Sequence, residues 1–403
     1  MYPTILFCAP KQGGILQSSG FLTLKSLMSL SRTARAHAFD ELSLILSIEN
    51  ELTRHHQVKT VDEAIVFWKK VYSNSLLKQW FECDGSSEPA EEIMTNMSDD
   101  VMCEAVRYEV MFGQMFRTLP ELLRLKMLNR QLQQDQSTLL HFAAKSGYHD
   151  SIHTILSLVP VAERSRVMNR SCTSDKSTVL HLAAASGSLE SVRVILSFYS
   201  ESERFSAVCA QDVFRRTVLC MAVVSGNLEL IKFILMLFPE SEERLQVIVM
   251  QRIEGDTVLH LAAMSGNVQL INLLLDHYPE SERSHTVFMK DMHEVTLLHY
   301  AACSGNAELI RYLLALVPKP ERLGLVRMKD RFQRTVLHCV GDVESIDLIL
   351  SLYPESSRLQ AICSQDEYGR SAMYRAKDSW ESLDTILHLL PETDRFQAVC
   401  FGG

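Results

Sequence analysis

A ten-residue block recurs along most of the chain and constrains its fold more than any other feature. In its full form the block runs from a Thr through a Leu-His pair and two alanines to a Gly. Copies begin at Thr138, Thr178, Thr217, Thr257, Thr296, Thr335 and, in degenerate form, Ser371. The starts are 40, 39, 40, 39, 39 and 36 residues apart. A fixed period of this length is typical of repeat proteins, in which each copy packs against its neighbours.

A second landmark, a proline after an apolar run, keeps the same period. It falls at Pro160, Pro239, Pro279, Pro318, Pro354 and Pro391, and Ser200 takes its place in one copy. An Arg usually follows four residues later, and adjacent glutamates predict a solvated ridge of ion pairs there. One period earlier the same pattern falls on Pro120 and Arg124. We therefore expect seven to eight copies over residues 98–403, the first and last degenerate.

Each copy is predicted to be helical. Leu259, Ala262 and Ala263 form one short apolar face, and Gly266 ends it at a turn that needs positive φ. Apolar residues from Val268 onward then recur at three- and four-residue spacing, which indicates a second helix. Neither helix can bury its apolar face alone, so the copies must stack into an all-α solenoid.

The block TVLHLAAMSG, from Thr257, resembles the ankyrin repeat, whose pattern is T-P-L-H-x-A-A-x-x-G. The resemblance covers about three quarters of the chain. In two respects the copies differ from that pattern: Val or Leu replaces its proline, and the period is about 39 residues instead of 33. The surplus lies in stretches such as PESERSHTVFMKD, which predict a short third helix. We expect that helix to shorten or partly replace the β-hairpin finger of the family.

Five histidines recur at one position of the block and raise the question of a metal or catalytic array. They are His141, His181, His260, His299 and His338. Stacked copies lie about 10 Å apart, too far for shared metal ligation. The resemblance implies instead that each His ties its own Thr to a neighbouring backbone group. The predicted pairs are Thr138–His141, Thr178–His181, Thr257–His260, Thr296–His299 and Thr335–His338, and Cys220 replaces the His of the remaining copy.

A partner-binding surface is expected where the scaffold does not dictate the residue. The position two before the turn Gly, which in ankyrin-like stacks lines a concave groove, reads Lys145, Ala185, Val224, Met264 and Cys303. Its last three residues predict an apolar strip. The fingertips add aromatic, Met and Arg side chains that are typical of interface hot spots. The tips carry Val213, Phe214, Arg215, Met292, His293, Arg331, Phe332 and Tyr368, and all of these except Val213 are predicted partner-binding residues. The alternative is that Phe214, Phe332 and Tyr368 only pack against neighbouring tips.

Composition and motifs exclude several other functions. Forty basic and forty-nine acidic residues give a net charge of −9, which argues against duplex nucleic acid as the ligand. No apolar run is long enough to span a membrane. The ten cysteines are scattered without a CxxC pair, which favours a reducing intracellular compartment without structural zinc. No phosphate loop, GxSxG or HExxH motif occurs, so we expect no enzyme activity, cofactor or small-molecule substrate in the repeats.

Residues 1–95 differ from the rest of the chain. Residues 22–81 read as amphipathic helices, and the polar segments DGSSEPAEE and SDD form an acidic linker. Residues 22–42 faintly resemble the later half of an F-box without its opening Leu-Pro. A Cys–His catalytic domain would have Cys8 or Cys83 and His37, His55 or His56 available, but nothing flanking them supports one.

These observations predict a non-enzymatic adaptor that holds a protein partner in the groove of an ankyrin-like solenoid. The long, degenerate copies are similar in style to ankyrin-repeat effectors that intracellular bacteria deliver into the host cytoplasm, which implies a host partner. The first alternative is an F-box-like substrate receptor of a ubiquitin ligase. The second is an enzyme whose activity lies before residue 95.

Overall fold

The computed structural model describes residues 99–107, 121–132, 137–172, 175–372, 374 and 380–395. The chain divides into two compact units, Met1–Thr173 and Ser174–Gly403, hereafter the N-terminal and C-terminal units. Regular structure in the described residues is helical apart from isolated β-bridges, which confirms the predicted all-α repeat fold. The predicted module at 1–95 and the F-box-like segment at 22–42 lie outside the described residues, so the boundary near residue 98 stays a prediction.

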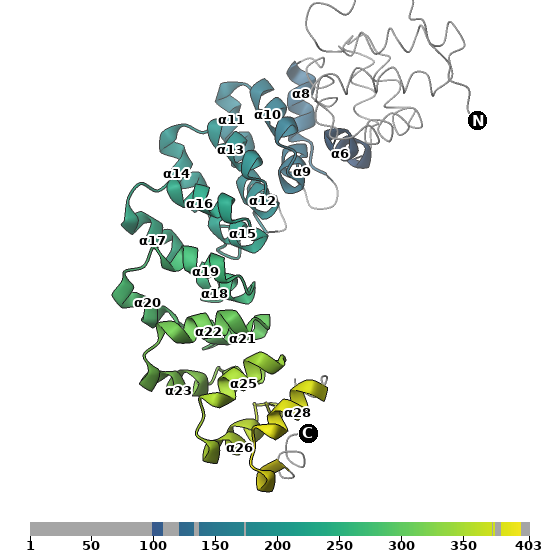
Figure 1. The fold of residues 1–403 in the computed structure, drawn as a ribbon. Helices are drawn as coiled ribbons and strands as arrows, with labels where there is room; N and C mark the ends of the chain where they lie inside the picture. The colour runs from purple at the N-terminus through teal and green to yellow at the C-terminus, as the bar shows by residue number, and fades with distance from the viewer. Residues whose placement is uncertain are drawn as a thin grey trace, which may run out of the picture. The chain divides into compact units, whose positions relative to one another are not determined.

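Five copies in the C-terminal unit contain three helices each, in a fixed order (Figure 1). The first helices are α12 (Val179–Ala185), α15 (Val218–Ser225), α18 (Val258–Met264), α21 (Leu297–Ser304) and α24 (Val336–Cys339). The second helices are α13 (Leu189–Ser197), α16 (Leu228–Met236), α19 (Val268–Leu275), α22 (Ala307–Leu316) and α25 (Val343–Ser351). The third helices are α14 (Glu201–Cys209), α17 (Ser241–Val249), α20 (Glu280–Thr286), α23 (Lys319–Arg327) and α26 (Glu355–Cys363). The last copy supplies α28 (Trp380–His388), which packs against α25.

The N-terminal unit repeats this plan. Its helices are α6 (Asp99–Arg107), α8 (Glu121–Asn129), α9 (Leu139–Ser146), α10 (His149–Leu158) and α11 (Val161–Met168). Helices α6, α8 and α10 all pack against α9. Helix α8 follows Pro120 as α11 follows Pro160, so α8 occupies the place of a third helix in the degenerate first copy.

The core lies between copies because the apolar face of each helix is covered by the next copy. In the C-terminal unit α12 packs on α15, α15 on α18, α18 on α21 and α21 on α24. Leu259, Ala262 and Ala263 are fully buried at these contacts, and so are Ile271 and Leu274 on the second helix. The alanines let neighbouring first helices approach closely, which explains why they recur.

The turn between the first two helices is also fixed by the next copy. Gly266 has φ of +71°, and a Cβ there would lie 3.2 Å from Ser304 Oγ. Asn306 caps the following helix with Oδ1, and its Nδ2 donates to the Gly266 carbonyl oxygen at 2.8 Å. Asn227 makes the same bond to Gly187. The asparagine therefore links two copies as well as starting its own helix.

The third helix accounts for the second sequence landmark. Pro160, Pro279, Pro318 and Pro354 are the N-cap residues of their third helices, and Ser200 caps α14 through a reciprocal bond with Glu203. The arginine four residues later turns its Nε back to a main-chain carbonyl oxygen, as from Arg322 to Val317 at 2.9 Å. Arg164, Arg204, Arg283, Arg358 and Arg395 make equivalent bonds. These hydrogen bonds join each third helix to the end of the preceding segment and recur from copy to copy. The predicted ridge of ion pairs did not include them.

The fingers are short turns between the third helix and the next first helix. Lys290 pairs with Thr296 and Gln365 with Ser371 as isolated antiparallel bridges. The third helix precedes the finger and does not replace it, so the fingers are shortened hairpins. The expectation of partial replacement by a helix was wrong, because the surplus residues form α20 and its equivalents upstream of the turn.

Candidate functional site

Each finger is built around a buried carboxylate. Asp330 Oδ1 accepts hydrogen bonds from the backbone N–H of Phe332 and Arg334, and Oδ2 pairs with the Arg334 guanidinium at 2.7 Å. Asp212–Arg216 and Asp366–Arg370 repeat this arrangement. In the finger at 250–256 the order is reversed, with Arg252 donating to Asp256. The sequence interpretation missed these arginines, although an Asp-Arg spacing of four residues recurring with the period was a readable signal.

Neighbouring fingers are joined by one main-chain hydrogen bond each. The N–H of the residue after the finger Asp donates to the preceding finger, as from Met292 to Glu254 O at 2.9 Å and from Arg331 to His293 O at 2.8 Å. Val213, Ile253 and Glu367 donate in the same way to Asp175, Phe214 and Phe332. Side chains at equivalent fingertip positions therefore form a row along the C-terminal unit.

The recurring histidines tie the first helix to the next finger. In every described pair the Thr N–H donates to His Nδ1 and the Thr Oγ1 lies within hydrogen-bond distance of the same nitrogen. Nδ1 is therefore an acceptor, so Nε2 carries the proton and donates onward. The Nε2 partners are the carbonyl oxygens of Arg170, Ala210 and Arg216, Met289, Arg334 and Ser364.

Burial keeps four of these imidazoles neutral. Desolvation lowers the pKa of His181, His260 and His338, and it lowers the pKa of His299 to about 4. In the copy with Cys220, Thr217 Oγ1 donates to the thiol and accepts the Cys220 N–H. Among the described residues no group of three His, Cys, Asp or Glu could hold a metal ion.

The predicted apolar strip of the groove (Val224, Met264 and Cys303), hereafter the groove strip, is exposed to solvent on three successive first helices. Val224 is 66% exposed and Met264 58%, and Cys303 is also exposed. Of the two earlier members of the same row, Lys145 is exposed and Ala185 is half-buried. The apolar part of the row is thus confined to the copies that begin at Thr217, Thr257 and Thr296.

Two further apolar rows belong to these three copies. At the fingertips Val213, Ile253 and Met292 occupy equivalent positions, one residue after Asp212, Arg252 and Asp291, and Ile253 and Met292 are each 56% exposed. On the first helices Met221, Leu261 and Tyr300 are half-buried, three residues before the groove strip and hence on the same helix face.

Tyr300 connects these rows, because its hydroxyl donates to Asp291 Oδ2 in the finger at 2.9 Å. Burial and this bond raise the pKa of Tyr300, so its hydroxyl stays protonated. We call the nine residues of the three rows the central surface. Sequence reasoning missed Ile253, Met221, Leu261 and Tyr300, and Ile253 was readable as the equivalent of Val213 and Met292.

The remaining fingertip residues contact one another. The Phe332 ring stacks on His293 at 5.9 Å and on Tyr368 at 6.5 Å, across three successive fingers. The Arg334, Arg370 and Arg216 guanidiniums lie over the Phe332, Tyr368 and Phe214 rings respectively. Arg215 and Arg331 are exposed. For Phe332 and Tyr368 the alternative interpretation, packing between tips, therefore describes the contacts in the structure.

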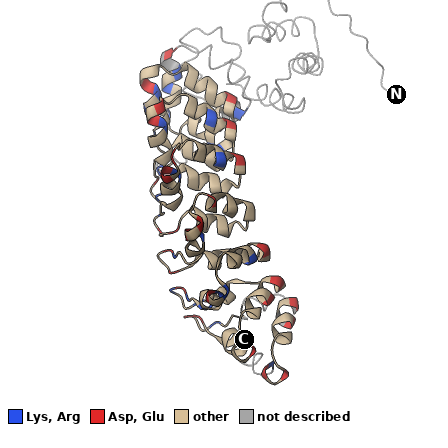
Figure 2. Ribbon diagram, turned by 60° about the vertical axis from the view of Figure 1, so that its left-hand side comes forward, with Lys and Arg blue, Asp and Glu red and all other residues tan. Residues whose placement is uncertain are grey.

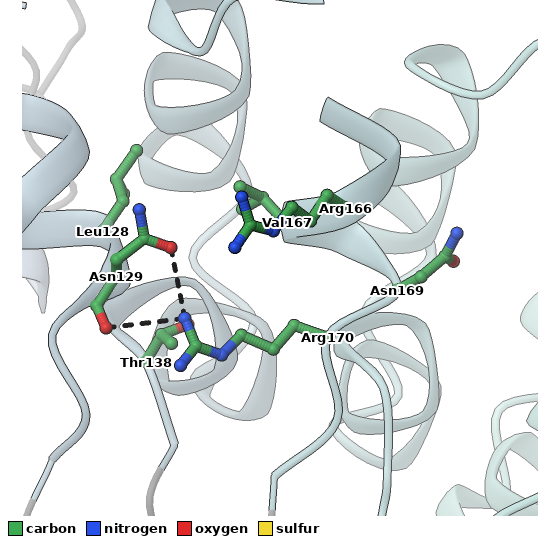
Figure 3. Close-up of a pocket in the computed structure, with 7 residues that line it drawn as sticks. All are labelled: Leu128, Asn129, Thr138, Arg166, Val167, Asn169 and Arg170. Atoms are coloured by element: carbon green, nitrogen blue, oxygen red, sulfur yellow. Dashed lines mark hydrogen bonds between the residues drawn. The ribbon is translucent and has the colours of Figure 1, made fainter. Parts of the chain in front are cut away.

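Outside the C-terminal unit, a hollow of about 520 Å³ lies between α8, α9 and α11 (Figure 3). It is lined by Leu128, Asn129, Thr138, Arg166, Val167, Asn169 and Arg170. Arg170 reaches across it to Asn129, contacting Oδ1 at 3.1 Å and the main-chain oxygen at 3.4 Å. Since Arg170 also receives the His141 tie through its own carbonyl oxygen, it joins α8 to the finger of the next copy. These contacts give the hollow a structural role.

Two cysteines lie at the ends of third helices. Cys209 and Cys363 are half-buried at the ends of α14 and α26, and burial raises the pKa of both thiols. Cys400 lies outside the described residues. In the described part of the chain no helix is both long enough and apolar enough to cross a bilayer.

Comparison with known proteins places this geometry in a family. The family model for ankyrin repeats (three copies) matches residues 105–204, 140–244 and 219–322, which together cover more than half of the chain. A solved structure that is similar, the human ASB11 ankyrin repeat domain, is 18% identical. The alignment covers 63% of this chain and 99% of that one, with a TM-score of 0.45. No curated protein matches the chain. With its helices stacked in register and its Thr-His pairs tied to shortened fingers, the chain belongs to the ankyrin-repeat family.

Proposed function

We propose that this chain is a non-enzymatic adaptor that holds a protein partner against the central surface. Ankyrin repeats are protein–protein interaction domains, and the proposal concerns which part of this one is used. The observation that carries it is the coincidence of three apolar rows in the same three copies. Of the twelve large apolar side chains that are exposed in the described residues, five belong to these rows: Val213, Val224, Ile253, Met264 and Met292.

An exposed apolar surface of this kind is unfavourable in water and is typical of an interaction site. The scaffold beneath it is held by the Asn, His and finger hydrogen bonds described above, so little conformational entropy is lost when a partner binds. The proposal includes the host-protein partner implied by the resemblance to bacterial effectors. A partner-binding role for Phe332 and Tyr368 is secondary, because their rings already stack on each other.

Affinity capture with the full chain tests the proposal. Val224→Ser/Met264→Ser removes two exposed apolar side chains from the central surface, and Val161→Ser/Met236→Ser is the matched control. Val161 and Met236 are each 75% exposed and lie outside the surface. We expect the first variant to lose the partner while its melting temperature stays within about 2 °C of the wild type, and the control to keep it. Retention of every captured protein by both variants would refute the proposal.

The same capture addresses the alternatives. Ubiquitin-ligase adaptor subunits retained by both variants would favour the F-box-like receptor, whose recruiting segment was predicted at residues 22–42. Catalytic turnover lost on substitution of Cys8 or Cys83 would favour the enzyme alternative.

A further inference from the structure

We infer that the occupant of the central surface is a basic, amphipathic α-helix whose apolar residues recur every seven positions. The inference rests on the proposed function and specifies the partner's chemistry. It follows from the spacing of the apolar rows and from the charge around them.

Spacing favours a helix that lies across the stacked first helices. The central surface presents one equivalent apolar position per copy, as in the row Val224, Met264 and Cys303. Packed helices are about 8–10 Å apart, so these positions recur at about that interval. Seven residues of an α-helix rise about 10.5 Å and return to nearly the same face. One side of a helix can therefore place an apolar residue on each of the three copies.

An extended strand does not match this interval. At about 3.3 Å per residue, three residues span about 10 Å, but residues three apart in a strand point to opposite faces. Residues two or four apart share a face, yet they span about 7 or 13 Å. A strand could place an apolar residue on one copy but not an equivalent residue on the next.

The arrangement of apolar residues within each copy also suits a helix. Each copy offers an exposed tip residue, a half-buried residue at the base and an exposed groove residue, as with Ile253, Leu261 and Met264. Leu261 is more buried than Ile253 and Met264, which are exposed. Apolar residues three or four apart on a partner helix share one face, so they can contact an exposed tip residue and an exposed groove residue of the same copy.

The net negative charge around the central surface favours a basic partner. Residues 211–316, which run from the first finger of the central surface to the end of α22, contain thirteen acidic and eight basic residues, a net charge of −5. Acidic residues stand at helix ends along the C-terminal unit (Figure 2), among them Glu308 just beyond the turn that follows Cys303. Glu229, at the equivalent position of an earlier copy, already pairs with Lys232 at 2.8 Å. Glu254 is exposed at the tip of the middle finger, and neither it nor Glu308 forms an ion pair with a described residue. Lys and Arg flanking the apolar seam of a helix would complement these carboxylates.

A peptide-display selection tests the inference on the full chain. A random 20-residue library is selected on the wild type and counter-selected on the Val224→Ser/Met264→Ser variant. We expect the enriched peptides to carry apolar residues seven apart, with others three or four residues from them, and to be rich in Lys and Arg and poor in Pro. Enriched peptides with apolar residues alternating every second position, with central prolines or with net negative charge would overturn the inference. A failure to enrich any peptide would overturn it too.

The best peptide is then synthesised with two matched variants. Inserting two alanines between its heptads keeps the helix but shifts the apolar phase, and a central Pro breaks the helix; each should weaken binding at least tenfold. Glu254→Gln/Glu308→Gln should weaken binding about threefold at low salt and less at high salt, whereas Val161→Ser/Met236→Ser should leave it unchanged. Equal binding of the Pro variant would exclude a helical occupant.

The outcomes separate this inference from the proposed function. If the captured partner depends on Val224 and Met264 but the selected peptides are extended, the helical occupant is wrong and the adaptor role stands. If neither the partner nor any peptide responds to the substitutions, the central surface itself is wrong.

Discussion

The fingers of the central surface and those nearer the C-terminus use their exposed side chains differently. Val213, Ile253 and Met292 present apolar side chains to solvent, whereas Phe332 and Tyr368 stack in one continuous row with His293. The finger at 250–256 also follows Cys220 and so lacks a histidine tie, while the fingers that follow it are tied by His260, His299 and His338. Exposure alone therefore does not mark a binding residue, because an aromatic fingertip can serve the stability of its own row.

The largest effect expected from the histidine ties is a loss of stability in mild acid. Because burial lowers the folded-state pKa of His299 to about 4, the unfolded chain, with a pKa near 6.5, binds the proton more readily. Stability is therefore full above pH 6.5 and declines as the pH falls toward 4. His299 alone should cost about 2 kcal/mol between pH 7 and pH 5, measured by urea unfolding. Equal stability at the two values would contradict a buried, neutral imidazole.

Hydrogen exchange at pH 5 sharpens the comparison between the two groups of fingers. Amides of residues 328–334, tied by His299, should lose more protection on acidification than those of residues 250–256, which have no such tie.

Removing one tie should have the next largest effect. His260→Ala leaves the Thr257 N–H and the Met289 carbonyl oxygen without their partner and should cost about 1–3 kcal/mol in chemical denaturation. His293→Ala, at a half-buried tip, is the control and should cost less than about 1 kcal/mol. Similar losses for both would remove the special role of the tie.

Truncation of a side chain at each surface tests whether the two regions differ as described. Phe332→Ala loses stacking on both sides and should destabilise the chain by about 1–2 kcal/mol. Met264→Ser should change the unfolding free energy by no more than about 0.5 kcal/mol, because the side chain is largely exposed. A clear loss from Met264→Ser would show that Met264 serves packing.

The smallest expected change is a gain in stability. Gln333 has φ of +61° at the finger position where Gly255 and Gly369 stand in other copies, and a side chain in that region costs about 1 kcal/mol. Gln333→Gly should therefore raise stability by up to about 1 kcal/mol. Arg331→Gly in the same finger should not, since Arg331 is outside the left-handed region. A loss on Gln333→Gly would mean that the Gln side chain makes a stabilising contact.

The sequence predicted the elements that repeat and missed those that depend on contacts between copies. The apolar periodicity and the Thr-His block were enough for the helices, their stacking and the family. The bonding partner of the landmark arginines was not predictable. Arg322 donates to a main-chain carbonyl oxygen, and the residue type at a position does not indicate that its carbonyl oxygen will be the acceptor. Packing of Phe332 and Tyr368 between tips was an open alternative, and deciding for it required the spacing of three fingers, which one-dimensional analysis does not provide. Ile253 was missed although the period places it, because its finger has Arg252 and Asp256 in reversed order.

The hydrogen bonds from finger to finger bear on how such a chain can change over generations. Each finger accepts a hydrogen bond from the one after it and donates one to the one before, so duplicating or deleting an entire unit leaves every bond satisfiable. Loss of a single residue within a finger would shift the register of all later contacts between fingers. The sixth copy, shortened between Cys339 and Asp342, keeps its finger at 330–334 complete, and its deletion falls where the first helix ends. Length variation in this protein should therefore be tolerated at that helix turn and eliminated by selection at the fingers.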